Sequence, residues 1–476
     1  MVRQFLKIFL YCLQTMVLNS RFLFFIILVF AMQVQARSKR DVKQLPLSSL
    51  VGADIVLKKK FSKAWCSRNG LAFLCNHCLA KSKTFLVPRE ACVQSRLHNQ
   101  IKQFESLHKE KQLASFFSFM VRVLLQEKLL NSPDEWVIKS HGGFMISSAD
   151  QPGKQLFYPS NTLSIKTHAN ALYLDNKRCD AQKIMIKPAH GYLHYDDYHY
   201  QGAFLVVIDQ ERAYLISQLD IEDYIFSVLR WESWPGWPVE VNKAFAIACR
   251  SYLIAKVLQA NKKNSLYHIK NSNIHQTYNG MHGCYNLKQA IDETRGLILA
   301  HNKKPIEAMF DCCCGDVIPA KLSGVNFKKA PYLARRYPCN FCKPCKIYAW
   351  RLEYSVKEFL DILHQAGYPI KTILDIAVVK KDSAGAAKEI LIRGNNAVIT
   401  FTGKQFYSLL TKIKSYCYTI EKKDDTIIFD GKGYGHHLGI CQWGARRMID
   451  EGWTYASILH FYYPGSMLME LKNTVS

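Results

Sequence analysis

Short runs in which apolar and polar residues alternate fill the stretch from Glu135 to Leu219. The runs are WVIKS, GFMISS, LSIKT, KIMIKP and AFLVVID, and Gly, Pro, Asn and Asp separate them. Such alternation of β-branched and aromatic residues is typical of strands, so we predict an antiparallel sheet here. From Val239 to Gln259 apolar residues instead recur at helical spacing. This pattern predicts a helix with one buried face, and Pro238 suits its first turn.

The N-terminus has a pattern of its own. Basic residues precede an unbroken apolar run, FLFFIILVFAM, from Phe22 to Met32, and small residues lead up to Ala36. This order is typical of a signal peptide, which we place at residues 1–36. The run is shorter than the about 20 apolar residues of a membrane span. We therefore expect cleavage and export, with retention as a membrane anchor as the alternative.

Residues 37–132 form a basic region before the predicted sheet. The pattern becomes helical from His98 to Asn131, where charged residues are interleaved among apolar ones. Four cysteines lie upstream of that segment: Cys66, Cys75, Cys78 and Cys92. Four thiolates suffice for a zinc site, but exported compartments are oxidising, so we favour two disulfides over zinc.

The composition adds three constraints. A hydrophobic fraction of 49% and a charged fraction of 21% are ordinary for a globular protein and exclude wholesale disorder. The net charge of +25 predicts an acidic partner, unless the basic surface is simply solvated, and export makes nucleic acid a poor candidate. Of the 16 cysteines Cys12 lies in the leader, so an odd number follows it and at least one thiol stays free or binds a metal.

The segment from Gly431 to Ala445, GKGYGHHLGICQWGA, carries the most chemistry. Its five glycines exclude a stable helix or an ordinary strand and let the backbone approach a ligand closely. His436, Gln442 and Trp443 offer an imidazole, an amide and an aromatic face, a set that suits the hydroxyls and the apolar ring face of a sugar. The alternative is a glycine-rich turn with a packed Trp. No Lys-Ser or Lys-Thr pair follows, which excludes a phosphate loop.

This segment resembles the C-terminal signature of the SpoIID/LytB domain of bacterial cell-wall proteins. That signature is a glycine-rich segment with an embedded His, followed by Cys-Gln-Trp-Gly-Ala, a helix and Tyr-Tyr-Pro-Gly. The matching residues here are Gly431, Gly433, Gly435, His436, Gly439, Cys441, Gln442, Trp443, Gly444, Ala445, Met448, Gly452, Ile458, Leu459, Tyr462, Tyr463, Pro464 and Gly465. The one departure inside the signature is His437, where the family usually has Gly.

The resemblance extends upstream and covers roughly Trp136 to Gly465. Its other matched residues are Tyr200, Gly202, Leu219, Glu222, Asp223, Tyr224, Glu232, Trp237, Pro238, Ala246, Arg250, Ser251, Tyr252, Gln276, Tyr278 and Gly280, with Gln201 in place of an Arg. We therefore place a SpoIID/LytB-like catalytic domain at residues 133–466, after a basic N-terminal extension at 37–132. Residues 467–476 are assigned as a C-terminal tail.

The resemblance implies an α+β fold in which antiparallel sheets surround a central helix and leave a groove for a glycan strand. A smaller, partly helical region with cysteines precedes it. Family members that act on the wall are similar to lytic transglycosylases, which break the MurNAc–GlcNAc β-1,4 bond and leave a 1,6-anhydro sugar. The implied location is the periplasm or the cell-wall side of the cytoplasmic membrane. The alternative is a non-catalytic wall-binding protein that enhances an amidase.

The resemblance also implies roles for particular residues. Glu232 corresponds to the catalytic Glu, which protonates the leaving oxygen and then accepts the proton of the substrate's own 6-hydroxyl. One carboxyl therefore suffices, and we expect its pKa to be raised by the surrounding Trp231, Trp234 and Trp237. The predicted substrate-binding residues are His436, Gln442, Gln276, Tyr278, Trp443 and Tyr200. If the enzyme hydrolysed its substrate instead, Asp311 and Asp223 would be the first candidates for a second carboxylate.

The expected partners are peptidoglycan glycan strands, with an amidase acting upstream as a further candidate. We expect no cofactor, no metal at the catalytic site, no nucleic acid, and membrane contact only through an uncleaved leader. Some family members resemble zinc proteins near the Gln-x-Tyr motif. Here the corresponding cysteines are missing, and only His268, His275, His282 and Cys284 lie near that motif.

Two departures from the family pattern concern the rim of the site. Ser233 and Trp234 stand where the family commonly has Met-Pro after its catalytic Glu. A hydroxyl-rich loop with Gly-Gly is replaced by cysteines and by Asp316, and three more cysteines follow downstream. The six are Cys312, Cys313, Cys314, Cys339, Cys342 and Cys345. We expect them to lie within reach of one another and to form disulfides, with thiolate zinc as the alternative.

Overall fold

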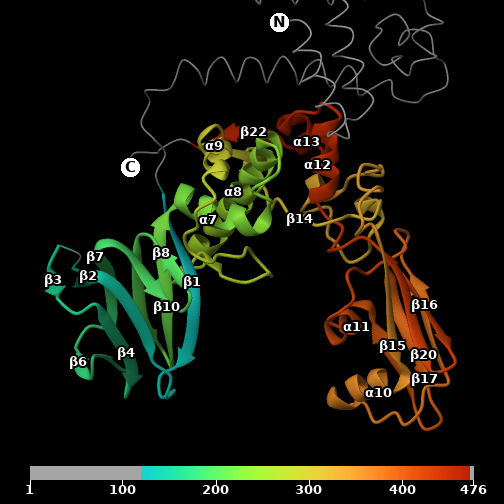
Figure 1. Cartoon of the computed structure of the whole chain (residues 1–476), viewed down its shortest axis with the longest axis horizontal. Coiled ribbons are helices and arrows are strands. Elements are labelled where there is room, and N and C mark those ends of the chain that lie inside the picture. Colours follow the sequence, from blue (N-terminus) through green and yellow to red (C-terminus); the bar gives the residue numbers. More distant parts are fainter. Residues whose placement is uncertain (1–118, 152, 472–476) are drawn as a thin grey trace, which may run out of the picture. The chain divides into compact units, whose positions relative to one another are not determined.

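The computed structural model describes residues 119–151 and 153–471 (Figure 1). The predicted leader and most of the predicted extension, including its four cysteines, lie outside the described residues. Within the described ranges the chain has an α+β fold with seven α-helices and both mixed and antiparallel sheets, so the predicted class is confirmed at this level. None of the described helices combines the length and the apolar character needed to cross a membrane.

The largest sheet has eleven strands in the order β11-β1-β10-β9-β7-β2-β4-β5-β6, with β3 paired to β2 and β8 to β7. All its pairs are antiparallel except β1 with β11. The strands are β1 (Met120–Leu129), β2 (Trp136–Ser148), β3 (Gln155–Tyr158), β4 (Thr162–His168), β5 (Ala171–Leu174), β6 (Lys177–Cys179), β7 (Lys183–Tyr195), β8 (Tyr198–Tyr200), β9 (Ala203–Asp209), β10 (Arg212–Asp220) and β11 (Ile269–Lys270). All five runs read from the sequence fall within β2, β4, β7 and β9, which confirms the predicted strands.

Strand β1 corrects the prediction of a helix up to Asn131. It pairs with β10 along its whole length and buries Val121 and Val123 completely. A bulge between Leu124 and Gln126 shifts the register and breaks the alternation that would have marked a strand. The predicted boundary between residues 132 and 133 is therefore wrong, because it would cut this sheet.

The predicted C-terminal tail also begins too early. Strand β22 (Met467–Glu470) pairs antiparallel with β12 (Leu297–His301), so residues 467–470 belong to the fold. A third short strand, β13 (Lys304–Pro305), completes this sheet on the other side of β12.

Helix α8 (Val239–Lys262) is the central helix (Figure 1). It matches the predicted helix from Val239, but it is buried on most of its sides rather than on one face, and Pro238 is its N-cap. The elements that contact it include β12 and four helices. Those helices are α7 (Ile221–Glu232), α9 (Asn286–Asp292), α12 (Gln442–Asp450) and α13 (Tyr455–Tyr462).

Residues 349–432 form a second hydrophobic core that was not separated from the catalytic domain in the prediction. Two three-stranded antiparallel sheets, β15-β20-β19 and β16-β17-β18, and two helices build it. Both helices begin with a capping box, which fixes their first turns. The elements are β15 (Ala349–Ser355), α10 (Val356–Gln365), β16 (Asp375–Lys381), β17 (Ala387–Arg393), β18 (Val398–Thr402), α11 (Gly403–Leu409), β19 (Tyr418–Lys423) and β20 (Thr426–Lys432).

Candidate functional site

Glu232 is the last residue of α7. The helix begins where the Asp220 side chain accepts a hydrogen bond from the Glu222 N–H, and it ends because Ser233 adopts an extended conformation. The Ser233 hydroxyl lies 2.6 Å from Asn242 Oδ1, and the Asn242 amide donates to the carbonyl of Trp237 at 3.2 Å. These bonds join the turn after Glu232 to the first turn of α8.

A buried ion pair connects α7 to α8. Arg250 donates from Nε to Glu222 Oε1 at 3.0 Å and from its terminal nitrogen to Oε2 at 2.7 Å. The same guanidinium donates to the carbonyls of Thr294 and Leu297 at 2.9 and 3.0 Å. Arg250 has no exposed area and Glu222 is 4% exposed. Two motif residues singled out by the resemblance therefore hold the helix that carries Glu232.

Glu232 is partly buried, and its carboxyl accepts the Thr277 N–H at Oε1, at 2.7 Å. Burial raises the pKa of Glu232 above the usual value for a Glu, and the hydrogen bonds from Thr277 oppose that shift. We also predicted a raised pKa for Glu232 from the sequence. Thr277 was missed, because a main-chain donor has no side-chain signature; its only signal was its place between Gln276 and Tyr278.

Three predicted substrate-binding residues are buried. Gln276 and Tyr278 are each 1% exposed, and Tyr200 is 3% exposed. Gln276 accepts from the Tyr224 hydroxyl at 3.0 Å and donates to the carbonyl of Cys249 at 3.2 Å, so protein groups occupy both ends of its amide.

The Tyr278 hydroxyl lies 3.0 Å from Ser217 Oγ, and its ring packs against Tyr200 and Tyr224. Gln276 and Tyr278, predicted to line the groove, and Tyr200, predicted to bind substrate, are therefore buried, and this part of the prediction is corrected. In this structure they are a buried support behind Glu232.

Gln442 contacts the Glu232 end of α7 directly, and Trp443 contacts the segment that follows this helix. The Gln442 side chain donates to the main-chain oxygen of Glu232 at 3.0 Å. Trp443 meets Trp237 edge to face at 5.3 Å between ring centroids, and Trp237 stacks on Trp234 at 6.0 Å. The structure thus brings together two motifs of the resemblance that are 210 residues apart in the sequence, at Glu232 and Gln442.

The three indoles in contact, Trp234, Trp237 and Trp443, form an aromatic row beside Glu232. Trp234 is 53% exposed, so its ring is open to a ligand rather than closed over the carboxylate. Trp231 is also half exposed and lies against Arg230 instead of joining the row. From the sequence Trp234 and Trp237 were expected only to raise the pKa of Glu232, and Trp443 was expected to bind substrate; the structure places the three rings in one row.

The glycine-rich segment approaches β14 (Phe310–Asp311) through the parallel strand β21 (Ile440–Cys441). A Cβ at Gly439 would overlap the main-chain oxygen of Met309, so no other residue fits there. His437 has a φ of +67° and Asp316 a φ of +63°, which is the left-handed region that glycine adopts most easily. Both residues stand where the family has glycine, so the backbone keeps the left-handed conformation at these two positions although the residue is no longer glycine.

His436 lies on the same segment, with 37% of its side chain exposed. Its Nδ1 accepts the Leu438 N–H at 3.1 Å and lies 3.9 Å from Asp311 Oδ2. Partial burial and the neighbouring His437 lower the pKa of His436, which favours the neutral imidazole. More than a third of the His436 side chain is thus accessible to solvent, and its role in substrate binding stays a prediction.

The two candidates for a second carboxylate are placed differently. Asp223 lies nine residues before Glu232 on the same helix, a rise of about 13 Å along the axis. Paired carboxylates of hydrolases lie roughly 5–9.5 Å apart. Asp311 is 6% exposed and accepts the main-chain N–H of His437.

The histidines near the Gln-x-Tyr motif do not form a metal site. His268 accepts the Arg122 N–H, His275 lies 3.1 Å from the Tyr252 hydroxyl, and His282 lies 2.6 Å from the carbonyl of Phe226. Across residues 119–151 and 153–471 one group of residues has metal-binding geometry, and it consists of cysteines. None of the eleven cysteines in these ranges forms a disulfide.

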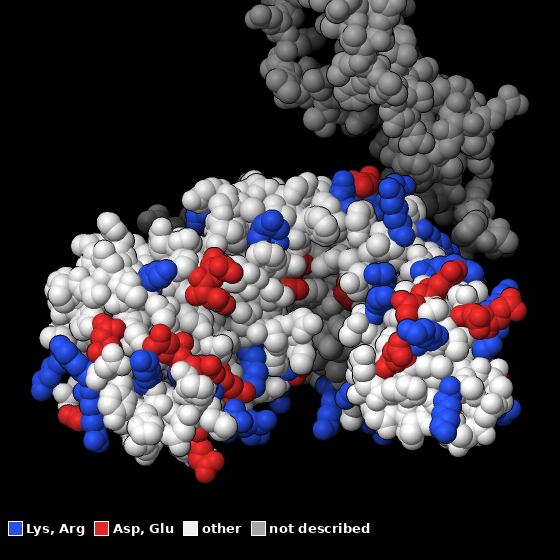
Figure 2. Space-filling view, turned by 60° about the horizontal axis from the view of Figure 1, so that its bottom comes forward, with Lys and Arg blue, Asp and Glu red and all other residues white. Residues whose placement is uncertain are grey.

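The positive charge is unevenly distributed along the chain. Residues 1–118 contain 19 Lys and Arg against 5 Asp and Glu, which gives +14 of the total +25. On the face shown in Figure 2, basic side chains lie among acidic ones. The charge that predicts an acidic partner is therefore concentrated in the first 118 residues of the sequence.

Comparisons with known proteins agree with the resemblance. The family described as Stage II sporulation protein (SpoIID) matches residues 209–301, which include Glu232 and Thr277. A domain of unknown function (DUF8618) matches residues 332–439, which include the whole second core.

Three relatives show how far the similarity extends. An uncharacterized protein of Brachyspira hyodysenteriae is 31% identical over 271 residues, 56% of this chain and 71% of that protein. The amidase enhancer of Bacillus subtilis is 24% identical over 363 residues, 64% of this chain and half of that protein. Stage II sporulation protein D of Bacillus amyloliquefaciens is 23% identical over 282 residues, 55% of this chain and 77% of that protein.

The fold and the Glu232 site define an α+β protein of the SpoIID type. This chain belongs to the SpoIID/LytB family.

Proposed function

We propose that this chain is an exported lytic transglycosylase of the bacterial cell wall, with Glu232 as its single acid and base. The observation that carries the proposal is the state of the Glu232 carboxyl. It is held by the Thr277 N–H at the end of a fixed helix, burial raises its pKa, and the exposed indole of Trp234 belongs to the row beside it. A carboxyl in this state keeps its proton to a higher pH than a free Glu and is suited to donate it to a glycosidic oxygen.

The distribution of carboxylates supports a non-hydrolytic route. Asp223 is too far along α7 to activate a water opposite Glu232, and Asp311 is buried and accepts the His437 N–H at one of its oxygens. In the proposed reaction Glu232 protonates the leaving oxygen. The resulting carboxylate accepts the proton of the substrate's 6-hydroxyl while that oxygen bonds to C1. The ring closes as a 1,6-anhydro sugar, so no water is consumed and one carboxyl performs both proton transfers.

The second candidate function is an amidase enhancer. The relative of that name from Bacillus subtilis is similar to this chain over 64% of its length, which supports this function comparably. An enhancer would bind the glycan through the same aromatic row and would stimulate an amidase without cutting the strand. Its function would not need a titrating carboxyl at position 232.

Digestion of purified sacculi separates the two functions. Intact and peptide-stripped sacculi are incubated with the purified chain, and the products are read by mass spectrometry. New anhydro-muramic ends support the transglycosylase. Sacculi that are bound but not cut, together with a faster release of stem peptides when an amidase is added, would establish the enhancer instead.

The aromatic row predicts a loss of binding without a loss of stability. Trp234→Ala removes an indole that is 53% exposed, so it should weaken glycan binding about tenfold or more while leaving the melting temperature within roughly 2 °C. Sacculus pull-down and thermal melts measure the two effects. Phe157→Ala is the matched control, because this ring on β3 is also 53% exposed. Equal binding by both variants would contradict the assignment of the row.

Export is the part of the proposal that rests on residues 1–36. We expect N-terminal sequencing of the protein from its native cells to begin near Arg37, because the leader ends in small residues at Ala36. A start at Met1 in a membrane fraction would show the leader kept as an anchor. A start at Met1 in the cytosol would contradict export.

A further inference from the structure

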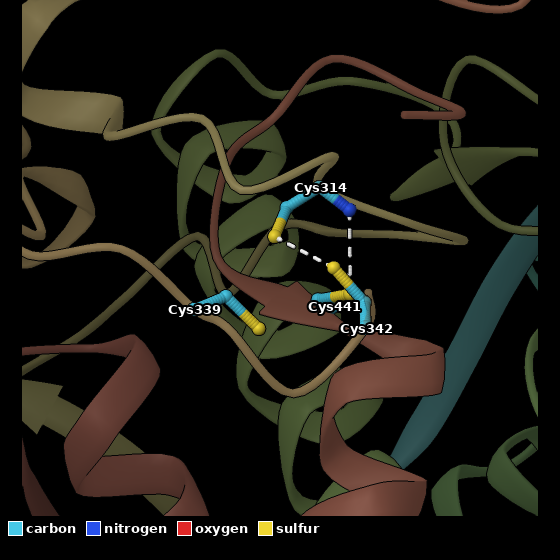
Figure 3. Close-up of side chains that lie close together, drawn as sticks. All are labelled: Cys314, Cys339, Cys342 and Cys441. Carbon is cyan, nitrogen blue, oxygen red and sulfur yellow. Dashed lines mark hydrogen bonds between the residues drawn. The ribbon is translucent and has the colours of Figure 1, made fainter. Parts of the chain in front are cut away.

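Four buried cysteines from three separate segments converge beside the candidate site (Figure 3). They are Cys314, which follows β14, Cys339 and Cys342 in the loop before β15, and Cys441 at the end of β21. Their four Sγ atoms all lie within 4.8 Å of one another, and each residue is at most 1% exposed. Cys441 is 127 residues from Cys314 in the sequence. From the sequence it was named only as part of the glycine-rich signature and was not grouped with the other cysteines.

The distances between these sulfurs fit one ion at their centre. Four thiolates around a tetrahedral zinc at about 2.3 Å are separated by about 3.8 Å from each other. The Sγ atoms of Cys314 and Cys342 lie 3.7 Å apart. A disulfide requires sulfurs about 2.05 Å apart and would join only two of the four. In a four-iron cluster each thiolate binds a different iron, so the sulfurs would lie farther apart.

We propose that Cys314, Cys339, Cys342 and Cys441 bind one structural zinc ion. Four thiolates complete the coordination of a tetrahedral zinc and leave no position for water or substrate. The site is therefore a cross-link rather than a catalytic centre. Of the six cysteines that we expected to lie within reach of one another, Cys314, Cys339 and Cys342 belong to this zinc site. Cys312, Cys313 and Cys345 do not, and Cys441 supplies the fourth ligand.

Donors around the sulfurs match the environment of a thiolate. The N–H groups of Cys314 and Gly444 donate to Cys441 Sγ at 3.2 and 3.3 Å. The second of these bonds caps α12, so Cys441 also lies at the positive end of that helix. The Tyr462 hydroxyl lies 3.1 Å from Cys339 Sγ. Such hydrogen bonds orient metal ligands and partly neutralise their charge.

Gly444 also fits the proposal. A Cβ at this position would overlap the Tyr462 hydroxyl and lie 2.7 Å from Cys339 Sγ, which is too close, and 3.2 Å from Cys441 Sγ, which is tight. Glycine here leaves the space that the four sulfurs need.

The zinc would hold the segment that reaches Glu232. Cys441 immediately precedes Gln442, whose side chain donates to the Glu232 carbonyl. The main-chain N–H of the next residue, Trp443, donates to the carbonyl of Cys312. The ion would join this segment to β14 and to the loop around Cys339. The effect of the zinc on catalysis rests on the proposed function of Glu232. The metal site itself does not depend on that proposal.

The test begins with the unaltered protein. The full chain is purified without chelator or added metal, and its metals are measured by elemental analysis. We expect about one zinc per chain and an X-ray absorption spectrum with four sulfur neighbours at about 2.3 Å. Protein without zinc, with disulfides among these four cysteines found by non-reducing peptide mapping, would overturn the proposal. So would iron in place of zinc, or a first shell containing nitrogen.

Variants then identify the ligands. Cys339→Ser and Cys342→Ser should each lower the zinc content at least fivefold, whereas Cys345→Ser should retain it. Cys345 is the matched control because it continues the same C-x-x-C-x-x-C spacing and lies outside the group of four. Equal zinc content in all three variants would overturn the assignment. If a ligand variant does not fold, the absorption spectrum of the unaltered chain still decides the number of sulfur ligands.

Discussion

Replacing Glu232 by Gln should abolish the formation of anhydro-muramic ends while sacculus binding persists. The amide keeps the size of the side chain and still accepts the Thr277 N–H, but it can neither donate the proton to the leaving oxygen nor take one from the 6-hydroxyl. General acid–base groups contribute about 10²–10⁴-fold, so we expect a loss on the order of hundreds-fold or more. Mass spectrometry of digested sacculi measures it.

The pH dependence provides an internal control. Because burial raises the pKa of Glu232, the proton donor is present at low pH, and kcat/KM should fall as the pH rises through that pKa. Stability follows the same linkage. Ionising the buried carboxyl costs the folded state stability as the pH rises above the roughly 4.3 of a free Glu.

Glu232→Gln should accordingly melt at a higher temperature than the unaltered chain at pH 7, and the difference should vanish below about pH 4. A difference that is the same at both pH values would mean that the carboxyl is not desolvated. Full activity of the Gln variant would exclude Glu232 as the acid, and cleavage that leaves reducing ends would mean hydrolysis with a second carboxylate.

Arg250→Met should cause a large loss of stability, because it breaks a fully buried ion pair from one side. It leaves the Glu222 carboxylate buried without its partner and removes the donor to the carbonyls of Thr294 and Leu297. Such a change costs about 3–5 kcal/mol in the free energy of unfolding. Denaturant titration followed by circular dichroism measures the loss.

The exposed pair of Arg447 with Glu451 is the matched control, since its side chains are 53% and 43% exposed. Arg447→Met should change the free energy of unfolding by less than about 0.5 kcal/mol. The double variant Glu222→Gln with Arg250→Met should lose less than the sum of the two single changes, because neither then leaves a buried charge unpaired. A cost below about 1 kcal/mol for Arg250→Met alone would show that the pair does not hold α7 to α8.

Part of the architecture follows from local patterns. The strands β2, β4, β7 and β9 were predicted because alternation along the chain is imposed by the pleat of each strand separately. Helix α8 was predicted for the same kind of reason, as its apolar spacing repeats within a single element. Glu232 and the glycine-rich segment were found through ordered motifs, which also lie along the chain.

Local patterns failed where a distant partner decides the conformation. The segment from Met120 to Leu129 reads as helix because a bulge interrupts its alternation, and only its pairing with β10 makes it a strand. The second core at residues 349–432 contains ordinary strands and helices. Nothing in their local pattern tells that they pack on one another rather than on α8.

The sequence by itself singled out the candidate residues for the chemistry, namely Glu232, Gln442 and the cysteines. Only the tertiary structure decided how they are used. It buries Gln276 and Tyr278 as supports, gives the Thr277 N–H to Glu232, and brings Cys441 rather than Cys312, Cys313 or Cys345 into the group with Cys314, Cys339 and Cys342. The physical reason is that burial and ligand geometry are properties of contacts between segments far apart in sequence, and such contacts leave no periodic signal in either segment.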